Sequence, residues 1–216
     1  MSHARLQVSC AVVTLASLAT IIARGQPASS DKTDLAEGPH ASMHATLERT
    51  VFSVDVLSLE IRVDPRTQLG LRELAQGHDY SALRADRIVR AVLQADHALV
   101  HVRFERDISV ARYLREAETQ LRLAARAGMM PRDTAEAAVA SFSRLLARLG
   151  ERGFEDGDVL VYRVRPDSVR VLLRAHDDRI LLDRTIDDPR SSRAVLGSYF
   201  APASPFREEL VRSLFR

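Results

Sequence analysis

Three short segments near the C-terminus constrain the fold most, because each places apolar residues at every second position. They read "DVLVYRVRP", "SVRVLLRAH" and "RILLDRTI", at residues 158–166, 168–176 and 179–186. The connections between them are "PD" and "DD", and polar two-residue connections favour tight hairpins. We therefore expect an antiparallel three-strand meander. Its core is predicted to include Val159, Val161, Val169, Val171, Ile180 and Leu182.

The rest of the chain divides by the period of its apolar residues. Two further strands are predicted, at 49–63 and 97–106. Helical spacing appears in segments that begin at a Ser, Asp or Pro suited to a helix N-terminus. These helices are predicted at 81–95, 107–128, 131–153, 191–200 and 204–215, with Ser81, Asp107 or Ser109, Ser191 and Ser204 as caps. An antiparallel sheet with helices gathered on one face is an α+β fold.

The N-terminal segment has the composition of a secretory signal peptide. One early cation, Arg5, precedes an uncharged stretch from Leu6 to Ala23. An uncleaved anchor helix or a cytosolic tail are the alternatives. Residues 26–44 are rich in Pro, Gly, Ser and charge, which is typical of a linker. We therefore expect a signal peptide at 1–25, a linker at 26–44 and one domain at 45–216, in a secreted or periplasmic protein whose only membrane contact would be an uncleaved N-terminal segment.

Charge and composition argue against several classes of function. The net charge is +2, aromatic residues make up 5% of the chain, and Trp is absent, so a basic, aromatic nucleic-acid face is not expected. The single cysteine, Cys10, lies in the predicted signal peptide, which leaves the domain without thiol chemistry. His97 and His101 are four apart on a predicted strand and form at best a weak metal pair. No phosphate loop or zinc motif is present, and we expect no metal and no cofactor.

The C-terminal third resembles the chalcone isomerase-like family. The resemblance rests on a Gly-Asp pair that opens the meander, on "AVLGSYF", and on "SPFREELVRSLF". Upstream, "VHVRFERDIS" followed by a helix is similar to the family's strand that ends in an Arg-Asp-hydrophobic-Ser element. The order of elements agrees from about residue 46 to the end, although no single motif is decisive.

The resemblance implies an open-faced β-sandwich with a cleft between a large antiparallel sheet and its helices. Plant members close a chalcone into a flavanone there, and other relatives hold a fatty acid or another carboxylate. Carried onto this sequence, the ligand-binding positions are Arg49, Asp55, Leu57, Tyr113 and Ser198. The slot of the family's catalytic Thr or Tyr hydroxyl holds Asp55 or Leu57, and the helix with Tyr113 has no Asn. The catalytic residues therefore stay unknown.

Arg49 has three interpretations. It binds a ligand's oxyanion, for which a guanidinium is well suited. Alternatively it extends into water from a strand end, or it pairs with Asp55, which requires the chain to fold back between them. The functional hypotheses are a non-catalytic binder of a small apolar anion such as a fatty acid, an isomerase of the intramolecular lyase type acting on a chalcone-like enone, and a structural or interaction domain with a filled cleft.

Overall fold

The computed structural model describes residues 42–49 and 54–215 of the 216-residue chain. The chain divides into two units, Met1–Lys32 and Thr33–Arg216, and every described residue lies in the second. The predicted signal peptide therefore lies outside the described residues, as does the predicted linker up to residue 41. Among the described helices, none has the length and apolar character needed to cross a membrane.

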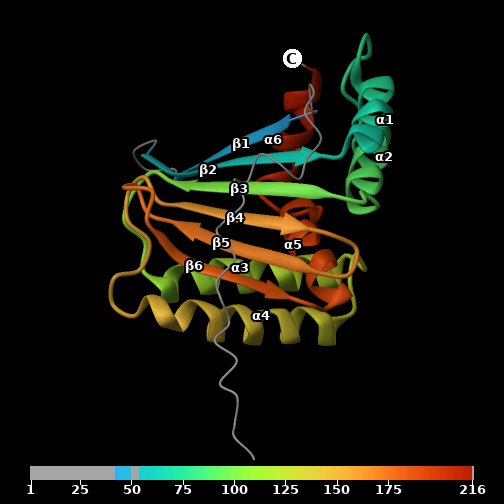
Figure 1. The fold of residues 1–216 in the computed structure, drawn as a ribbon. Helices are drawn as coiled ribbons and strands as arrows, with labels where there is room; N and C mark the ends of the chain where they lie inside the picture. Colours follow the sequence, from blue (N-terminus) through green and yellow to red (C-terminus); the bar gives the residue numbers. More distant parts are fainter. Residues whose placement is uncertain (1–41, 50–53, 216) are drawn as a thin grey trace, which may run out of the picture. The chain divides into compact units, whose positions relative to one another are not determined.

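The described strands form one antiparallel sheet in which each strand pairs with its neighbours in sequence (Figure 1). The order is β1-β2-β3-β4-β5-β6. The strands are β1 (Ser42–Arg49), β2 (Val54–Val63), β3 (Ala98–Phe104), β4 (Val159–Val164), β5 (Val169–Arg174) and β6 (Ile180–Ile186). The α+β class and the predicted meander are both confirmed. β1 begins three residues before the predicted domain boundary at residue 45.

One strand prediction was wrong, because the segment 49–63 is not a single strand. Arg49 ends β1, and β2 begins only at Val54. The two strands pair as a hairpin in which Arg49 lies opposite Val54 and Glu48 lies opposite Asp55. The connecting letters "TVFS" contain no Gly, Pro, Asn or Asp, so the sequence shows none of the residues that mark a turn.

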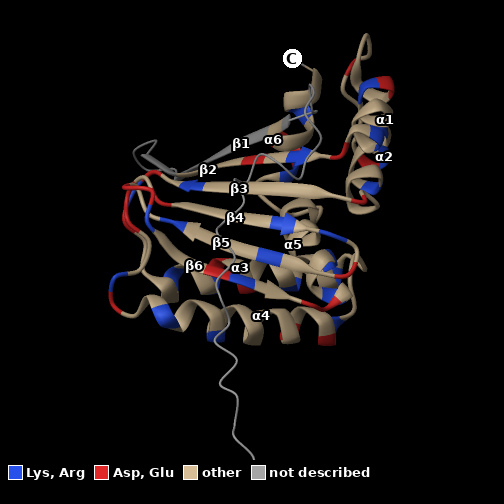
Figure 2. Cartoon of the chain, in the orientation of Figure 1, with Lys and Arg blue, Asp and Glu red and all other residues tan. Residues whose placement is uncertain are grey.

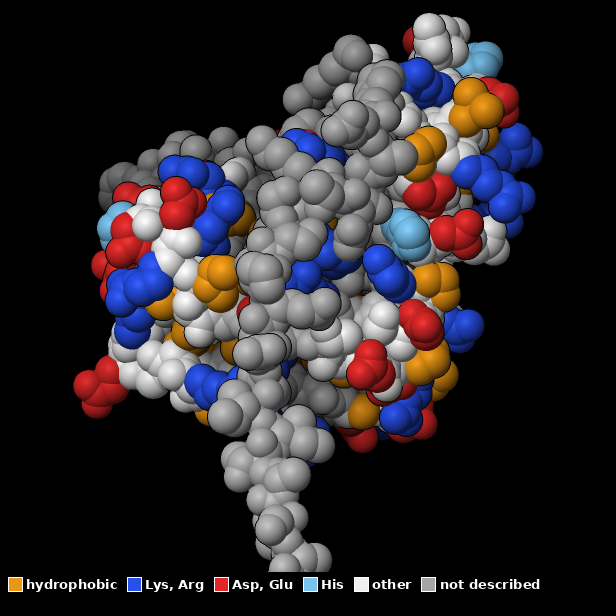
Figure 3. All heavy atoms as spheres, viewed as in Figure 1, with side chains coloured by type: hydrophobic (Ala, Val, Ile, Leu, Met, Phe, Trp, Pro, Cys, Tyr) orange, Lys and Arg blue, Asp and Glu red, His pale blue; other side chains and the backbone are white. Residues whose placement is uncertain are grey.

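The inner face of the sheet carries the main core and the outer face is largely polar. On β4 the side chains of Leu160 and Tyr162 point inward and are at most 3% exposed, so Val159 and Val161 point outward. Ile180 is 46% exposed, against its predicted place in the core. A register shift between Leu173 and Arg174 in the β5–β6 ladder contributes to this difference. On the outer face, Val161 joins only a small satellite cluster, and Figures 2 and 3 show charges of both signs interspersed on this side.

Helices cover the inner face and one end of the sheet. They are α1 (Pro65–Ala75), α2 (Ala82–Leu93), α3 (Val110–Arg126), α4 (Arg132–Leu146), α5 (Pro189–Phe200) and α6 (Arg207–Arg212), with short 3₁₀ turns at Ala147–Leu149 and Ser213–Phe215. Helices α3, α4 and α5 pack against one another, and α6 packs against β1. Gly197 of α5 permits a close approach, because a Cβ there would lie 2.7 Å from Met130 Cε, just before α4.

The helix ends follow the sequence in part. Ser81 and Ser109 cap α2 and α3 through their side chains, as predicted. Asp107 is not a cap; its carboxylate instead accepts a hydrogen bond from the Asp156 backbone. Two predicted caps were wrong: Asp188 caps α5 in place of Ser191, and α6 begins after Phe206 although Ser204 was predicted to start it.

The sequence reading missed helix α1. Its start has the expected signal, because Asp64 accepts hydrogen bonds from the Arg66 and Thr67 backbone N–H groups. Pro65 occupies the first helical position, where proline costs no hydrogen bond.

Candidate functional site

A cavity of about 170 Å³ lies between the inner face of the sheet and helices α3 and α5. Its floor is formed by β2, β3 and β4 through Leu57, Val102 and Tyr162. The remaining lining side chains come from the helices and the segments that precede them. They are Ile108, Arg112, Tyr113, Glu116, Ala117, Gln120, Leu121, Phe142, Ala194, Val195, Ser198, Tyr199, Pro205 and Phe206.

Helix α3 forms one wall of this cavity because of its side-chain spacing. Tyr113, Ala117 and Leu121 are four residues apart, and Arg112, Glu116 and Gln120 form a parallel row. Residues at this spacing share one face of a helix. Of the whole helix only Leu121 and Ala124 are fully buried. The apolar side of α3 thus faces a space that the protein's own side chains do not fill.

Three tyrosine hydroxyls meet in the cavity wall. The Tyr113 and Tyr162 hydroxyls are 2.8 Å apart and share a hydrogen bond, and Tyr199 lines the same cavity. Burial, followed by the effect of the neighbouring phenols, raises the pKa of all three groups well above the usual tyrosine value. The three phenols therefore stay neutral and can donate or accept hydrogen bonds at physiological pH.

The bond between Tyr113 and Tyr162 uses one O–H proton of that pair. All three tyrosines line the cavity, so their hydroxyls can form hydrogen bonds with a bound molecule. Gln120 adds an acceptor, since its buried Oε1 atom has no hydrogen-bond partner.

The structure brings three of the five predicted ligand-binding residues together. Leu57, Tyr113 and Ser198 all line the cavity. The Ser198 hydroxyl donates to the Val195 carbonyl oxygen at 2.7 Å, so its proton is committed to its own helix. The side chains of Arg49 and Asp55 lie outside the described part of the structure, and their proposed roles remain predictions.

Sequence reasoning missed Arg112, Gln120, Tyr162 and Tyr199. The three on α3 and α5 could have been found, because Arg112 and Gln120 share a face of α3 with Tyr113, and Tyr199 follows Ser198. Tyr162 lies on β4, and its inward direction depends on the register of the meander. That register could not be read from a segment in which both faces carry apolar residues.

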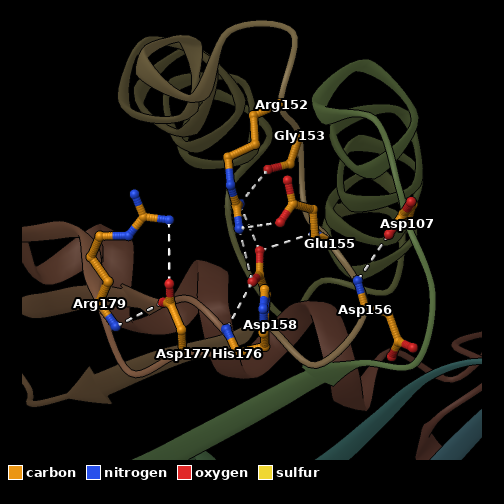
Figure 4. Close-up of polar contacts among 9 residues, drawn as sticks. All are labelled: Asp107, Arg152, Gly153, Glu155, Asp156, Asp158, His176, Asp177 and Arg179. Atoms are coloured by element: carbon orange, nitrogen blue, oxygen red, sulfur yellow. Dashed lines mark hydrogen bonds and ion pairs between the residues drawn. The ribbon is translucent and has the colours of Figure 1, made fainter.

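A second polar cluster lies at the loop that opens the meander (Figure 4). Asp158 is fully buried and holds Arg152 through contacts of 2.7 and 3.0 Å. The backbone N–H groups of Glu155 and His176 donate to the same carboxylate. Burial alone would raise the pKa of Asp158, but these hydrogen bonds outweigh it and leave the pKa below its ordinary value.

This cluster stabilises the loop before β4 and is not a ligand site. Ligand atoms of Glu155, Asp158 and His176 lie within 4.8 Å of one another, as a metal site would require. Both Asp158 oxygens, however, already accept two hydrogen bonds each, and the Arg152 guanidinium occupies the position of a cation. The donor set therefore does not favour a metal. It explains the Gly-Asp pair instead, since Gly157 has a φ of +82° beside the His176 side chain.

Comparison with known structures identifies the fold. A fatty-acid binding protein from Arabidopsis thaliana superimposes with a TM-score of 0.54 and 10% sequence identity, over 82% of this chain and 86% of that one. The chain has the chalcone isomerase-like fold. At this identity the likeness establishes the fold alone. No family model matches the chain, and no curated protein matches it.

Within the chalcone isomerase-like fold, the cavity lies where the sequence resemblance places the ligand cleft, between the sheet and its helices. This agreement concerns only the place of the cavity in the fold. Which molecule the cavity can hold depends on the residues that line it here.

Proposed function

We propose that this domain is a non-catalytic binder of a fatty acid or another apolar carboxylate. The observation that carries the proposal is the cavity between the sheet and α3, whose lining is mostly apolar and includes one arginine, Arg112, and one glutamate, Glu116. A concave, mostly apolar site with a few polar groups is typical of small-molecule binding. The Arabidopsis protein of the same fold, described as fatty-acid binding, supports the ligand class. The signal-peptide composition of residues 1–25 supports a place in the cell envelope.

Two other functions fit the cavity less well. A structural domain with a filled cleft would not leave a space of about 170 Å³ in its core. An isomerase needs a donor for the developing oxyanion. The strand position where the family resemblance expects a hydroxyl holds Asp55 or Leu57, and neither an ionised carboxylate nor a leucine can donate; the Ser198 proton is already bonded.

The phenol cluster is the one observation that favours an isomerase, because a phenol hydroxyl in the lining could donate to an enone carbonyl. Incubation of the purified protein with 2′-hydroxychalcone decides the matter. We expect the chalcone absorbance to decay no faster than in buffer with an inert protein. Protein-dependent formation of flavanone that disappears in Tyr162→Phe would replace the binder with an enzyme.

Native mass spectrometry of the full chain tests the binding proposal. We expect one apolar acid per chain, either co-purified or added, and its loss in Ala117→Leu. Ala117 is a partly buried lining residue of α3, so a leucine there fills the cavity from a helical position that tolerates it. A protein that carries no acid, and takes up none over a range of chain lengths and rings, would refute the proposal.

A further inference from the structure

The size of the cavity limits what it can hold. Its volume of about 170 Å³ is close to the ~150 Å³ of an engineered cavity that accommodates benzene. Pockets for drug-sized ligands typically reach ~300–1,000 Å³. A single ring fills this space, whereas a long acyl chain would have to leave most of its length outside the cavity mouth or displace side chains of the close-packed core.

The lining favours a ring over a flexible chain. The protein has seven Phe, four Tyr and no Trp. Five of these eleven aromatic side chains line the one cavity, and they are Tyr113, Phe142, Tyr162, Tyr199 and Phe206. Aromatic rings gain from edge-to-face and offset contacts with one another beyond the area they bury. Edge-on pairs already occur in the wall, between Phe142 and Tyr162 and between Tyr199 and Phe206.

The charge partner for an acid is present on the same helix. Arg112 lines the cavity and is only partly buried, and no ion pair of its side chain is found among the described residues; Glu116, one turn further along α3, lines the cavity too but is exposed. Its neighbour Tyr113 has a phenol hydroxyl that is bonded to Tyr162 and also lines the cavity. A guanidinium and a phenol hydroxyl from adjacent positions can together hold the oxygens of one carboxylate.

We infer that the cavity selects its ligand by size, taking an acid with a single aromatic ring and excluding long-chain fatty acids, with Arg112 as the partner of the carboxylate. The inference rests on the proposed function and narrows its ligand class. It also assigns a charge-binding role to a residue outside the set expected from the family resemblance.

Isothermal titration of the full chain with acids of different size tests the selection. The probes are 3-phenylpropionate, dodecanoate and hexadecanoate. We expect 3-phenylpropionate to bind one per chain and the two long acids to bind at least about tenfold more weakly, because most of each chain must either stay outside the cavity or displace core side chains. Tighter binding of dodecanoate would overturn the size limit and leave the proposed function intact. If none of the three acids binds, the proposed function fails with it.

Variants that change the cavity volume separate size from chemistry. Val195→Ala and Phe142→Leu remove atoms from the lining, and we expect each to shift the preference toward dodecanoate. Because two variants are tested, a folding defect in one of them leaves the other to test the size limit. A preference that does not move in the variants that fold would contradict selection by size.

The role of Arg112 is tested by a charge-matched pair. We expect Arg112→Gln to weaken 3-phenylpropionate at least about tenfold and to spare the neutral 3-phenylpropionamide, because only the acid loses a charge-assisted bond. Arg115→Gln removes the same charge from an exposed position of α3 that does not line the cavity, and should change neither ligand. Equal losses for acid and amide, or equal effects of the two variants, would remove Arg112 from the site.

Discussion

At the scale of single residues, Asp158 carries the largest predicted contribution to stability. Its side chain is 0% exposed and pairs with Arg152, which is 22% exposed. Asp158→Asn leaves Arg152 with only the Glu155 carboxylate, 2.9 Å away and 41% exposed, and we expect a loss of about 3 kcal/mol in the free energy of unfolding, the lower end for a broken buried pair. Urea denaturation measures it. Asp178→Asn is the matched control, since that side chain is 86% exposed and exposed pairs contribute at most ~1 kcal/mol.

The Asp158 carboxylate also predicts how the free energy of unfolding changes with pH in the acid range. The folded-state pKa of Asp158 is lowered, so the unfolded state binds more protons at low pH. Its contribution is fully present above the unfolded value of about 3.9 and is lost as pH falls through the folded value. Asp158→Asn should therefore flatten the dependence of unfolding free energy on pH in the acid range. An unchanged acid slope in this variant would show that other carboxylates govern it.

The three tyrosines of the cavity predict a loss of stability at alkaline pH. The folded-state pKa values of Tyr113, Tyr162 and Tyr199 are raised, so their contribution is complete below the unfolded value of about 10. Stability should then fall as pH rises above it, because the unfolded chain ionises first. Tyr162→Phe should make this alkaline decline shallower in urea denaturation. A decline equally steep in the variant would place its origin elsewhere in the chain.

Among the elements, the approach to β4 depends on a glycine that contacts another backbone. Gly153 has a φ of +68°, and a Cβ on it would lie 2.7 Å from the Ile108 carbonyl oxygen. Ile108 and Phe154 form the bridge that ties the start of α3 to this loop. Gly128, with a φ of +72° and nothing within 4 Å of its would-be Cβ, provides a control for backbone strain alone.

We expect Gly128→Ala to cost about 1–2 kcal/mol from the left-handed backbone, and Gly153→Ala to cost clearly more because the bridge must also shift. Thermal unfolding of the two variants gives the comparison. Equal losses would mean that the loop moves freely away from Ile108.

The elements that the sequence predicted share a local signal. Ser81 and Ser109 precede amphipathic segments, and both cap their helices. The failures have local causes as well. The connection between β1 and β2 contains none of the residues that usually mark a turn. Strand β4 is apolar on both faces, so which face points inward is decided only by its pairing with β3 and β5.

For the whole molecule, the order of the elements and the pattern of apolar residues predicted the fold better than they predicted the site. The resemblance of the C-terminal third indicated the chalcone isomerase-like arrangement, and a solved structure with that fold agrees over 82% of the chain. The site is formed by residues from three strands, three helices and two connecting segments. A cavity among so many elements depends on how closely they pack, and no periodicity in one segment encodes that distance.

The central claim is that the cavity beneath α3 is the place where an apolar acid binds. Titration of the ¹⁵N-labelled full chain with 3-phenylpropionate, followed by amide NMR, tests it most directly. We expect saturable changes in amide chemical shift that are concentrated in α3, in α5 and at Phe206. These changes should be lost in Ala117→Leu. Shifts confined to the outer face of the sheet, or the same shifts in Ala117→Leu, would contradict the claim.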